Sequence, residues 1–224
     1  MNRKLLAWSV ASSLAVGISI AAEAQEARFA EPTTLVVDPA RSYVLAVTGV
    51  EGALSFLGHR HAILATSFET DACFDLGPEG RSKVVVTIPT RSLRIDTERG
   101  RQLADLGEGL DPGEVAELQE KMLGPEYLAA DQHEQIRLEA TRVVERQPGE
   151  YLLEGNLTLR GRTNQVRVPV EIEELEGDAL RVTGSFPITH AEYGMEPESV
   201  AGVVQVANEI ELSFSLHAVP RPGC

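Results

Sequence analysis

The chain has 224 residues and a formal net charge of −14, with 20 Lys and Arg against 34 Asp and Glu. This acidity argues against binding to nucleic acid or to anionic membrane surfaces, because both would repel the protein. The length suits one domain with enough chain to bury a core.

The first 24 residues have the features of a secretory signal peptide. Arg3 and Lys4 precede an apolar stretch, and an Ala-Glu-Ala cleavage site ends at Ala24. The predicted cut falls between Ala24 and Gln25, so we expect a periplasmic or secreted protein. A membrane anchor is the alternative, but the stretch is short for a bilayer span and rich in Ser, Ala and Gly.

Two cysteines, Cys73 and Cys224, follow the leader. In an oxidising compartment an even number of cysteines permits one disulfide. Cys224 is the last residue, however, and chain ends are often poorly ordered. The sequence therefore leaves both a disulfide and two unpaired thiols open.

Strand-like segments follow one another through most of the chain. The clearest, residues 165–175, 180–188 and 208–217, alternate apolar and polar residues with period two. Such strands have one dry and one wet face, which is typical of antiparallel sheets. Weaker candidates are residues 34–38, 42–49, 62–70, 83–89, 135–141 and 151–159. Eight to nine strands without alternating helices predict an all-β sandwich or barrel.

A charged, helix-permissive segment, residues 96–127, interrupts the strands. Asp111 is a candidate N-cap and Pro112 suits the first helical position. Val115, Leu118 and Met122 then fall on one face of a short helix. That face can close the open end of a barrel, or the helix can cover the flank or an edge strand of a sheet.

The chemical motifs of common enzymes are absent from the sequence. There is no Gly-x-Ser-x-Gly nucleophile motif and no phosphate-binding glycine loop. His59 and His61, in "FLGHRHAIL", are two apart, so on a strand both would face one side and could share a metal ion. A third ligand would come from His133, His190, His217 or an acidic residue. The alternative is a pair of partly buried imidazoles bonded to backbone carbonyls.

Four segments, in order, carry a resemblance to a known family. They are "LVVDPARSYVLAV" with its Asp-Pro-Ala-x-Ser, "GNLTLRGRTNQVRVPV" with a Leu-Thr-Leu-x-Gly-x-Thr hairpin, "ITHAEYGM" and the closing strand "VANEIELSFSLHA". Through them the chain resembles the YceI family of exported lipocalin-like proteins over residues 33–219. One departure is an acidic segment, residues 105–120, that is longer than the family pattern.

The resemblance implies an extended antiparallel barrel of about eight strands with a short inserted helix. It also implies a non-catalytic protein, without a cofactor, whose apolar interior holds a polyisoprenoid or an isoprenoid-quinone lipid. Transient contact with membranes or membrane proteins, and a homodimer, are compatible with such a role. A barrel filled by its own side chains, acting as an adaptor, is a further alternative.

Alternation along the strands predicts which residues line the cavity. We expect this lining to include Val44, Ala46, Val168, Val170, Phe186, Ile188, Leu212 and Phe214. His59 and His61 follow Gly58 at the start of a strand, so we expect them at a barrel end, where they would meet a polar headgroup. A periplasmic metal-binding protein using these two histidines is the alternative function.

Overall fold

The computed structural model describes residues 29, 31–51, 59–76, 82–196, 199–200 and 204–224. The predicted leader, its cleavage before Gln25 and the Gly58 turn lie outside these residues. In the described part, no helix is both long and apolar enough to cross a membrane.

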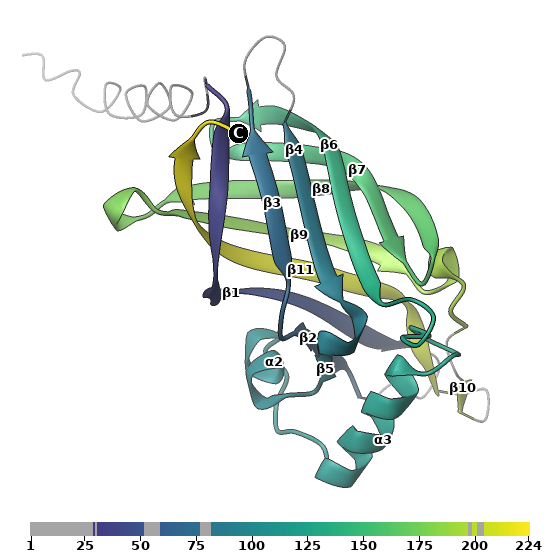
Figure 1. Ribbon diagram of the computed structural model, residues 1–224. Coiled ribbons are helices and arrows are strands. Elements are labelled where there is room, and N and C mark those ends of the chain that lie inside the picture. Colours follow the sequence, from purple (N-terminus) through teal and green to yellow (C-terminus); the bar gives the residue numbers. More distant parts are fainter. Residues whose placement is uncertain (1–28, 30, 52–58, 77–81, 197–198, 201–203) are drawn as a thin grey trace, which may run out of the picture.

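Strands make up most of the described chain (Figure 1). They are β1 (Thr33–Glu51), β2 (His61–Ala65), β3 (Glu69–Phe74), β4 (Lys83–Pro89), β5 (Leu93–Ile95), β6 (Gln135–Gln147), β7 (Glu150–Leu159), β8 (Arg162–Glu174), β9 (Leu180–Thr189), β10 (Ser199–Val200) and β11 (Val204–Pro222).

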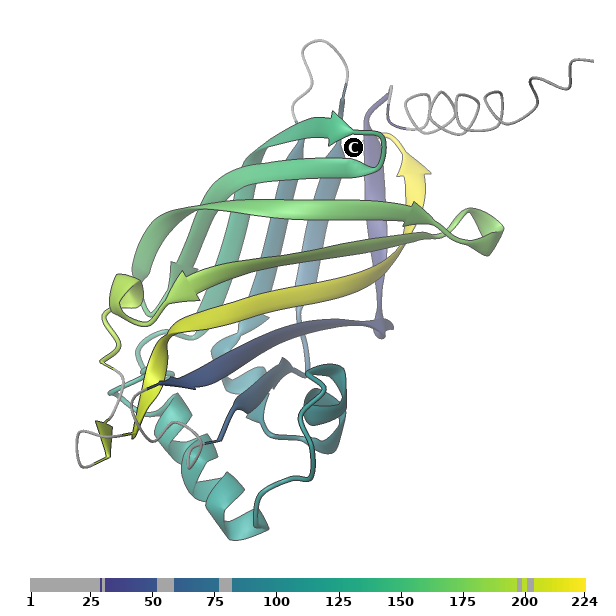
Figure 2. The ribbon, with the colours of Figure 1, turned by 180° about the vertical axis from the view of Figure 1, so that it is seen from behind.

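Eight of these strands form a closed barrel. They pair antiparallel in the order β1-β11-β9-β8-β7-β6-β4-β3, and β3 pairs back to β1. The predicted all-β antiparallel barrel of about eight strands is therefore confirmed. Figure 2 shows the long strands β7, β8, β9 and β11 curving around the rear wall.

A sharp bend divides β1 into two segments, and both segments pair with β11. The pairing of β1 with β11 shifts register between Asp38 and Tyr43. The Asp38 carboxylate accepts the Ala40 N–H at 3.0 Å, and the buried Ser42 hydroxyl donates to the Asp38 carbonyl at 2.6 Å. Ser42 also accepts the His217 N–H at 2.9 Å, which ties the bend to β11. The hydrogen bonds of the Asp-Pro-Ala-x-Ser motif therefore stabilise the bend in the strand.

Beyond the bend, β1 carries a small extension of the sheet outside the barrel. β2 pairs with β1, and β5 pairs with β2 as the edge strand. The helix α2 (Glu98–Leu103) starts at Thr97, whose side chain accepts the Gly100 N–H. A second apolar cluster lies on the outer face here, formed by Leu45, Val47, Ala62 and Leu64 with Ala104 and Leu106 packed against it.

The helix α3 (Pro112–Leu123) begins as predicted, with the Asp111 carboxylate accepting the Gly113 N–H at 2.8 Å. Its Gln119 side chain accepts the Ile95 N–H and donates to the Leu93 carbonyl, so α3 pairs with both backbone groups of the β5 edge. Met122, on the same helix, is buried and lines the barrel cavity. The two alternatives for this helix therefore both hold, since it covers an edge strand and contributes to one barrel end.

Two local expectations were wrong. Residues 62–70 are not one strand, because β2 ends at Ala65 and β3 begins at Glu69. The segment 96–127 contains two helices rather than one, since α2 precedes α3. In both cases the chain leaves the barrel wall to build the extension, which local alternation does not show.

The two cysteines form a disulfide, with Cα atoms 5.9 Å apart. Cys73 lies on β3, and Cys224 follows the end of β11. β1 runs between these strands, and Thr34 pairs with both Cys73 and Arg221. The disulfide therefore closes the barrel seam at the end opposite α3, where Figure 1 places the C-terminus.

Candidate functional site

The barrel encloses an apolar cavity of about 200 Å³. Its walls come from all eight barrel strands, from β2 and β5, and from Met122 of α3. Among the described residues, no Asp, Glu, Lys or Arg lines it. The polar lining residues are Thr48, Thr70, Tyr127, His190 and Ser213.

All eight apolar residues that alternation placed in the cavity lie on its wall: Val44, Ala46, Val168, Val170, Phe186, Ile188, Leu212 and Phe214. Strand register explains why they share one face, because side chains directly opposite on paired strands point the same way. Ala46 pairs with Leu212, which in turn pairs with Phe186. Their contact with a ligand stays a prediction.

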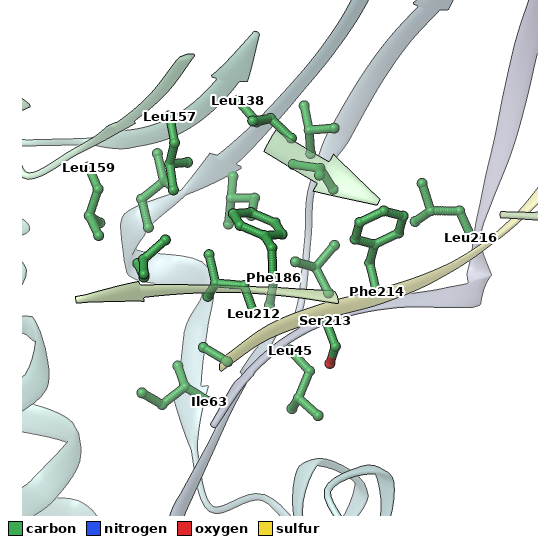
Figure 3. Close-up of a pocket in the computed structure, with 18 of the residues that line it drawn as sticks. Leu45, Ile63, Leu138, Leu157, Leu159, Phe186, Leu212, Ser213, Phe214 and Leu216 are labelled. Atoms are coloured by element: carbon green, nitrogen blue, oxygen red, sulfur yellow. The ribbon is translucent and has the colours of Figure 1, made fainter. Parts of the chain in front are cut away.

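The close-up in Figure 3 shows the aromatic part of the wall. The Phe186 and Phe214 rings rise from β9 and β11 into the interior. Leu45 and Ser213 also border the cavity, but their side chains point the opposite way. Gly184 pairs with Phe214 across these strands. A Cβ at Gly184 would come within 2.5 Å of the Phe214 ring, so this glycine makes room for the ring.

One end of the cavity carries most of its polar groups. Thr48 lies at the α3 end of β1, is only 7% exposed, and pairs in register with Ile210. Its hydroxyl oxygen has no hydrogen-bond partner among the described residues. Ile210 pairs with Ile188 on β9, two residues before His190, so Thr48 and His190 lie at the same end.

His190 is a buried imidazole in this wall, 3% exposed. Its Nδ1 lies 3.1 Å from the Asn208 carbonyl and therefore donates to it, and its ring meets Tyr127 edge-on at 6.2 Å. Burial lowers the pKa of His190 by more than hydrogen bonds to the Asn208 and Ala207 carbonyls raise it. The ring is therefore neutral at neutral pH.

The two histidines singled out by spacing, His59 and His61, do not line the cavity, although His61 pairs in register with Thr48 at its polar end. His59 is exposed. The Nδ1 atom of His61 lies 2.6 Å from the Asp96 carboxylate. The expectation that these imidazoles bond to backbone carbonyls is wrong for Nδ1 of His61, whose partner is this carboxylate.

Asp96 holds the extension together. Its side chain is fully buried and also accepts the Ala62 N–H and an Arg101 N–H, both at 3.0 Å. Burial alone would raise the pKa of Asp96, but the bonds from His61, Ala62 and Arg101 outweigh it and lower the pKa below its usual range. The arrangement joins β2, β5 and α2, which makes His61 a structural anchor.

The alternative of a metal centre finds no support in the described part of the chain. No group of three or more His, Cys, Asp and Glu side chains there is placed to hold an ion. His61 is committed to Asp96, and His190 lies in the wall of the cavity.

Sequence reasoning missed three residues of the cavity end. Thr48 continues the alternation of Val44 and Ala46 and could have been found from it. Tyr127 and His190 follow a helix and a strand, where no periodicity applies, and only the fold brings their rings together.

A closed eight-stranded barrel around one apolar cavity is a lipocalin-like barrel, a class that can enclose a single ligand. The YceI-like domain model matches residues 35–218 of this chain. The chain therefore belongs to the YceI family, as the four sequence segments predicted.

Solved structures with the same fold include three from bacteria. BcnA from Burkholderia cenocepacia has a TM-score of 0.61 at 20% identity, covering 82% of this chain and 100% of BcnA. The Campylobacter jejuni YceI protein has a TM-score of 0.51 at 13% identity, covering 72% of this chain and 84% of its own. A polyisoprenoid binding domain from Saccharophagus degradans has a TM-score of 0.52 at 12% identity, covering 84% and 98%. No curated protein matches the chain.

Proposed function

We propose that this protein is an exported, non-catalytic carrier that binds a polyisoprenoid or isoprenoid-quinone lipid inside the barrel. The observation that carries the proposal is the cavity itself, whose described lining contains no Asp, Glu, Lys or Arg. Such a wall favours a hydrocarbon chain, because a charged group would lose its water there without gaining an opposite charge.

The energy gained by burying the lipid chain is comparable with the cost of association, so chain length decides the affinity. Each buried methylene contributes about 0.8 kcal/mol, so about ten carbons contribute roughly 8 kcal/mol. The cost of association is about 4 to 15 kcal/mol, which a short chain does not overcome. Affinity should therefore rise with the length of the prenyl chain until the cavity is full.

Two comparisons support the choice of ligand. The chain belongs to the YceI family, and the barrel from Saccharophagus degradans with the same fold is a polyisoprenoid binding domain. Branched prenyl units also suit a wall built from Val, Leu, Ile and Phe, whose side chains leave an irregular apolar surface.

Export is supported from both ends of the chain. The first 24 residues have the pattern of a signal peptide, and Cys73 and Cys224 form a disulfide. Disulfides persist in oxidising compartments such as the bacterial periplasm and are rare in the cytosol.

The absence of catalysis is part of the proposal and rests on the polar end of the cavity. The Thr48 hydroxyl has no hydrogen-bond partner among the described residues, so no neighbouring base activates it. His190 donates through Nδ1 to the Asn208 carbonyl, and among the described residues no hydrogen bond joins its other ring nitrogen to Thr48. These groups can bond a ligand, but they do not form a nucleophile and base pair.

A series of prenyl alcohols tests the proposal. Geraniol, geranylgeraniol and solanesol would compete with a fluorescent apolar probe for the mature, disulfide-bonded protein. We expect geraniol to bind weakly and the longer alcohols progressively more tightly. Binding of none of the three, or affinity that does not change with chain length, would contradict the carrier function.

A further inference from the structure

The Thr48 side chain places a hydroxyl in a cavity wall that is otherwise mostly apolar, and binding of a hydrocarbon chain does not require this hydroxyl. Val44, Ala46 and Thr48 succeed one another on the cavity face of β1, and all three line the cavity. Thr48 is 7% exposed, and its hydroxyl oxygen has no partner among the described residues. A buried hydroxyl without a partner is costly, and because the Thr48 side chain lines the cavity, rotation about its Cα–Cβ bond can turn the hydroxyl toward a ligand.

Among the described residues that line the cavity with Thr48, there is no Lys or Arg to pair with an anionic group. His61, its neighbour in register on β2, is paired through Nδ1 with the Asp96 carboxylate. His190, at the same end, is buried and held by the Asn208 carbonyl. Neither imidazole is therefore a free positive charge.

One arginine near this end is engaged in hydrogen bonds to backbone carbonyls. Arg160, in the β7–β8 turn, donates to the carbonyls of Gly194 and Pro125. The chain as a whole carries a net charge of −14, which repels anions on approach. A diphosphate entering the cavity would lose its hydration without a compensating charge.

We propose that Thr48 is the headgroup contact and that the cavity selects lipids with an uncharged oxygen headgroup, a prenyl alcohol or a quinone carbonyl, over prenyl diphosphates. The hydroxyl donates to a carbonyl or alcohol oxygen, and it also accepts from an alcohol. Tyr127 and His190 form the wall beside it. This inference rests on the proposed function, because it concerns the same cavity.

Three probes with equal carbon number separate the headgroup from the chain. Geranylgeraniol carries an alcohol, geranylgeranyl diphosphate carries an anion, and phytane carries no headgroup. The wild type should bind the alcohol at least about tenfold more tightly than the diphosphate, because a buried unpaired charge is far costlier than a bonded hydroxyl. Thr48→Val keeps the side-chain shape and removes the hydroxyl, so alcohol binding should weaken roughly two- to tenfold, while phytane binding stays unchanged.

Two further variants make the result specific. Thr48→Ser retains the hydroxyl and should keep the affinity for the alcohol. Ser215 lies on β11 between the lining residues Phe214 and Leu216, so its side chain points to the outer face of the barrel. Ser215→Ala removes this outer hydroxyl and should leave the affinity for all three probes unchanged. Thermal unfolding of each variant shows that the barrel is folded.

The outcomes distinguish this inference from the proposed function. If no probe binds, the carrier function itself is wrong. If the alcohol and phytane bind but Thr48→Val binds the alcohol like the wild type, Thr48 is not the headgroup contact. A wild type that binds the diphosphate as tightly as the alcohol overturns the selection for an uncharged headgroup.

Discussion

Replacing Ala46 with leucine would fill part of the cavity from its wall. Ala46 lies on the cavity face of β1 between Leu212 on one side and Ile63 on the other, with which it pairs in register. A cavity of about 200 Å³ can accept the larger side chain without forcing the strands apart. The substitution therefore tests occupancy of the cavity and leaves the fold intact.

The expected loss of affinity follows from the carbons displaced. Leucine adds about three carbons, and each methylene that the ligand no longer buries forfeits about 0.8 kcal/mol. The total is about 2.4 kcal/mol, which raises the Kd roughly 60-fold. Titration of geranylgeraniol against an apolar fluorescent probe measures this change.

A matched control places the same bulk outside the barrel. Ser215→Leu enlarges a side chain on the outer face of β11, since Phe214 and Leu216 on either side of it line the cavity. This variant should bind geranylgeraniol like the wild type. If Ala46→Leu remains folded and binds with unchanged Kd, the lipid does not occupy this cavity and the reasoning is refuted.

Three further predictions concern stability. The Cys73→Ser/Cys224→Ser variant loses a disulfide between residues 151 apart in the sequence. Its free energy of unfolding in guanidinium should fall by about 5 kcal/mol, because the unfolded chain regains the entropy of the open loop. An unchanged value would contradict a barrel seam held by the disulfide. The pKa of Asp96 is lowered by folding, so its contribution is present above the unfolded pKa of about 3.9 and is lost as pH falls through the folded pKa. Asp96→Asn should cost about 3 kcal/mol in urea unfolding at neutral pH and less at pH about 3, whereas an equal loss at both pH values would argue against the ionised pair. The pKa of His190 is also lowered by folding, so on acidification the unfolded chain binds this proton before the folded protein does. The free energy of unfolding should therefore fall below pH about 6.5, by up to about 1.4 kcal/mol per pH unit. The His190→Gln variant should lack this slope, and a slope that persists in the variant would exclude His190 as its source.

Period-two alternation predicted the barrel wall well because each strand has one wet and one dry face. In β8, Val168 and Val170 alternate with exposed residues, and β9 and β11 repeat the pattern through Phe186 and Phe214. Closure of the barrel places the dry faces of β8, β9 and β11 on the inside, so alternation and topology agree there. The fold and the apolar lining were therefore accessible from sequence.

The groups that depend on distant partners were not accessible. His61 and Asp96 are 35 residues apart, and only the pairing of β2 with β5 brings them together. The disulfide joins residues 151 apart through the closure of the barrel. The meeting of Tyr127 with His190 likewise needs α3 to be in place at the barrel end. Such contacts are set by topology, which local patterns do not encode.

The two-residue spacing of His59 and His61 was a misleading indication of a shared binding site. Two histidines on one strand face suggest a shared ligand, but His61 is held by Asp96 and His59 is exposed. The buried hydroxyl of Thr48 carries no comparable signal, because a threonine in a strand is ordinary.

The central claim is that the cavity holds a prenyl lipid, and the most direct measurement is of what the native protein carries. The protein purified from the cells that make it would be extracted with organic solvent, and the extract analysed by mass spectrometry and compared with the amount of protein. The account predicts a prenyl alcohol or quinone species at close to one per chain. An extract without any prenyl species, from protein whose barrel is folded and disulfide-bonded, would contradict it.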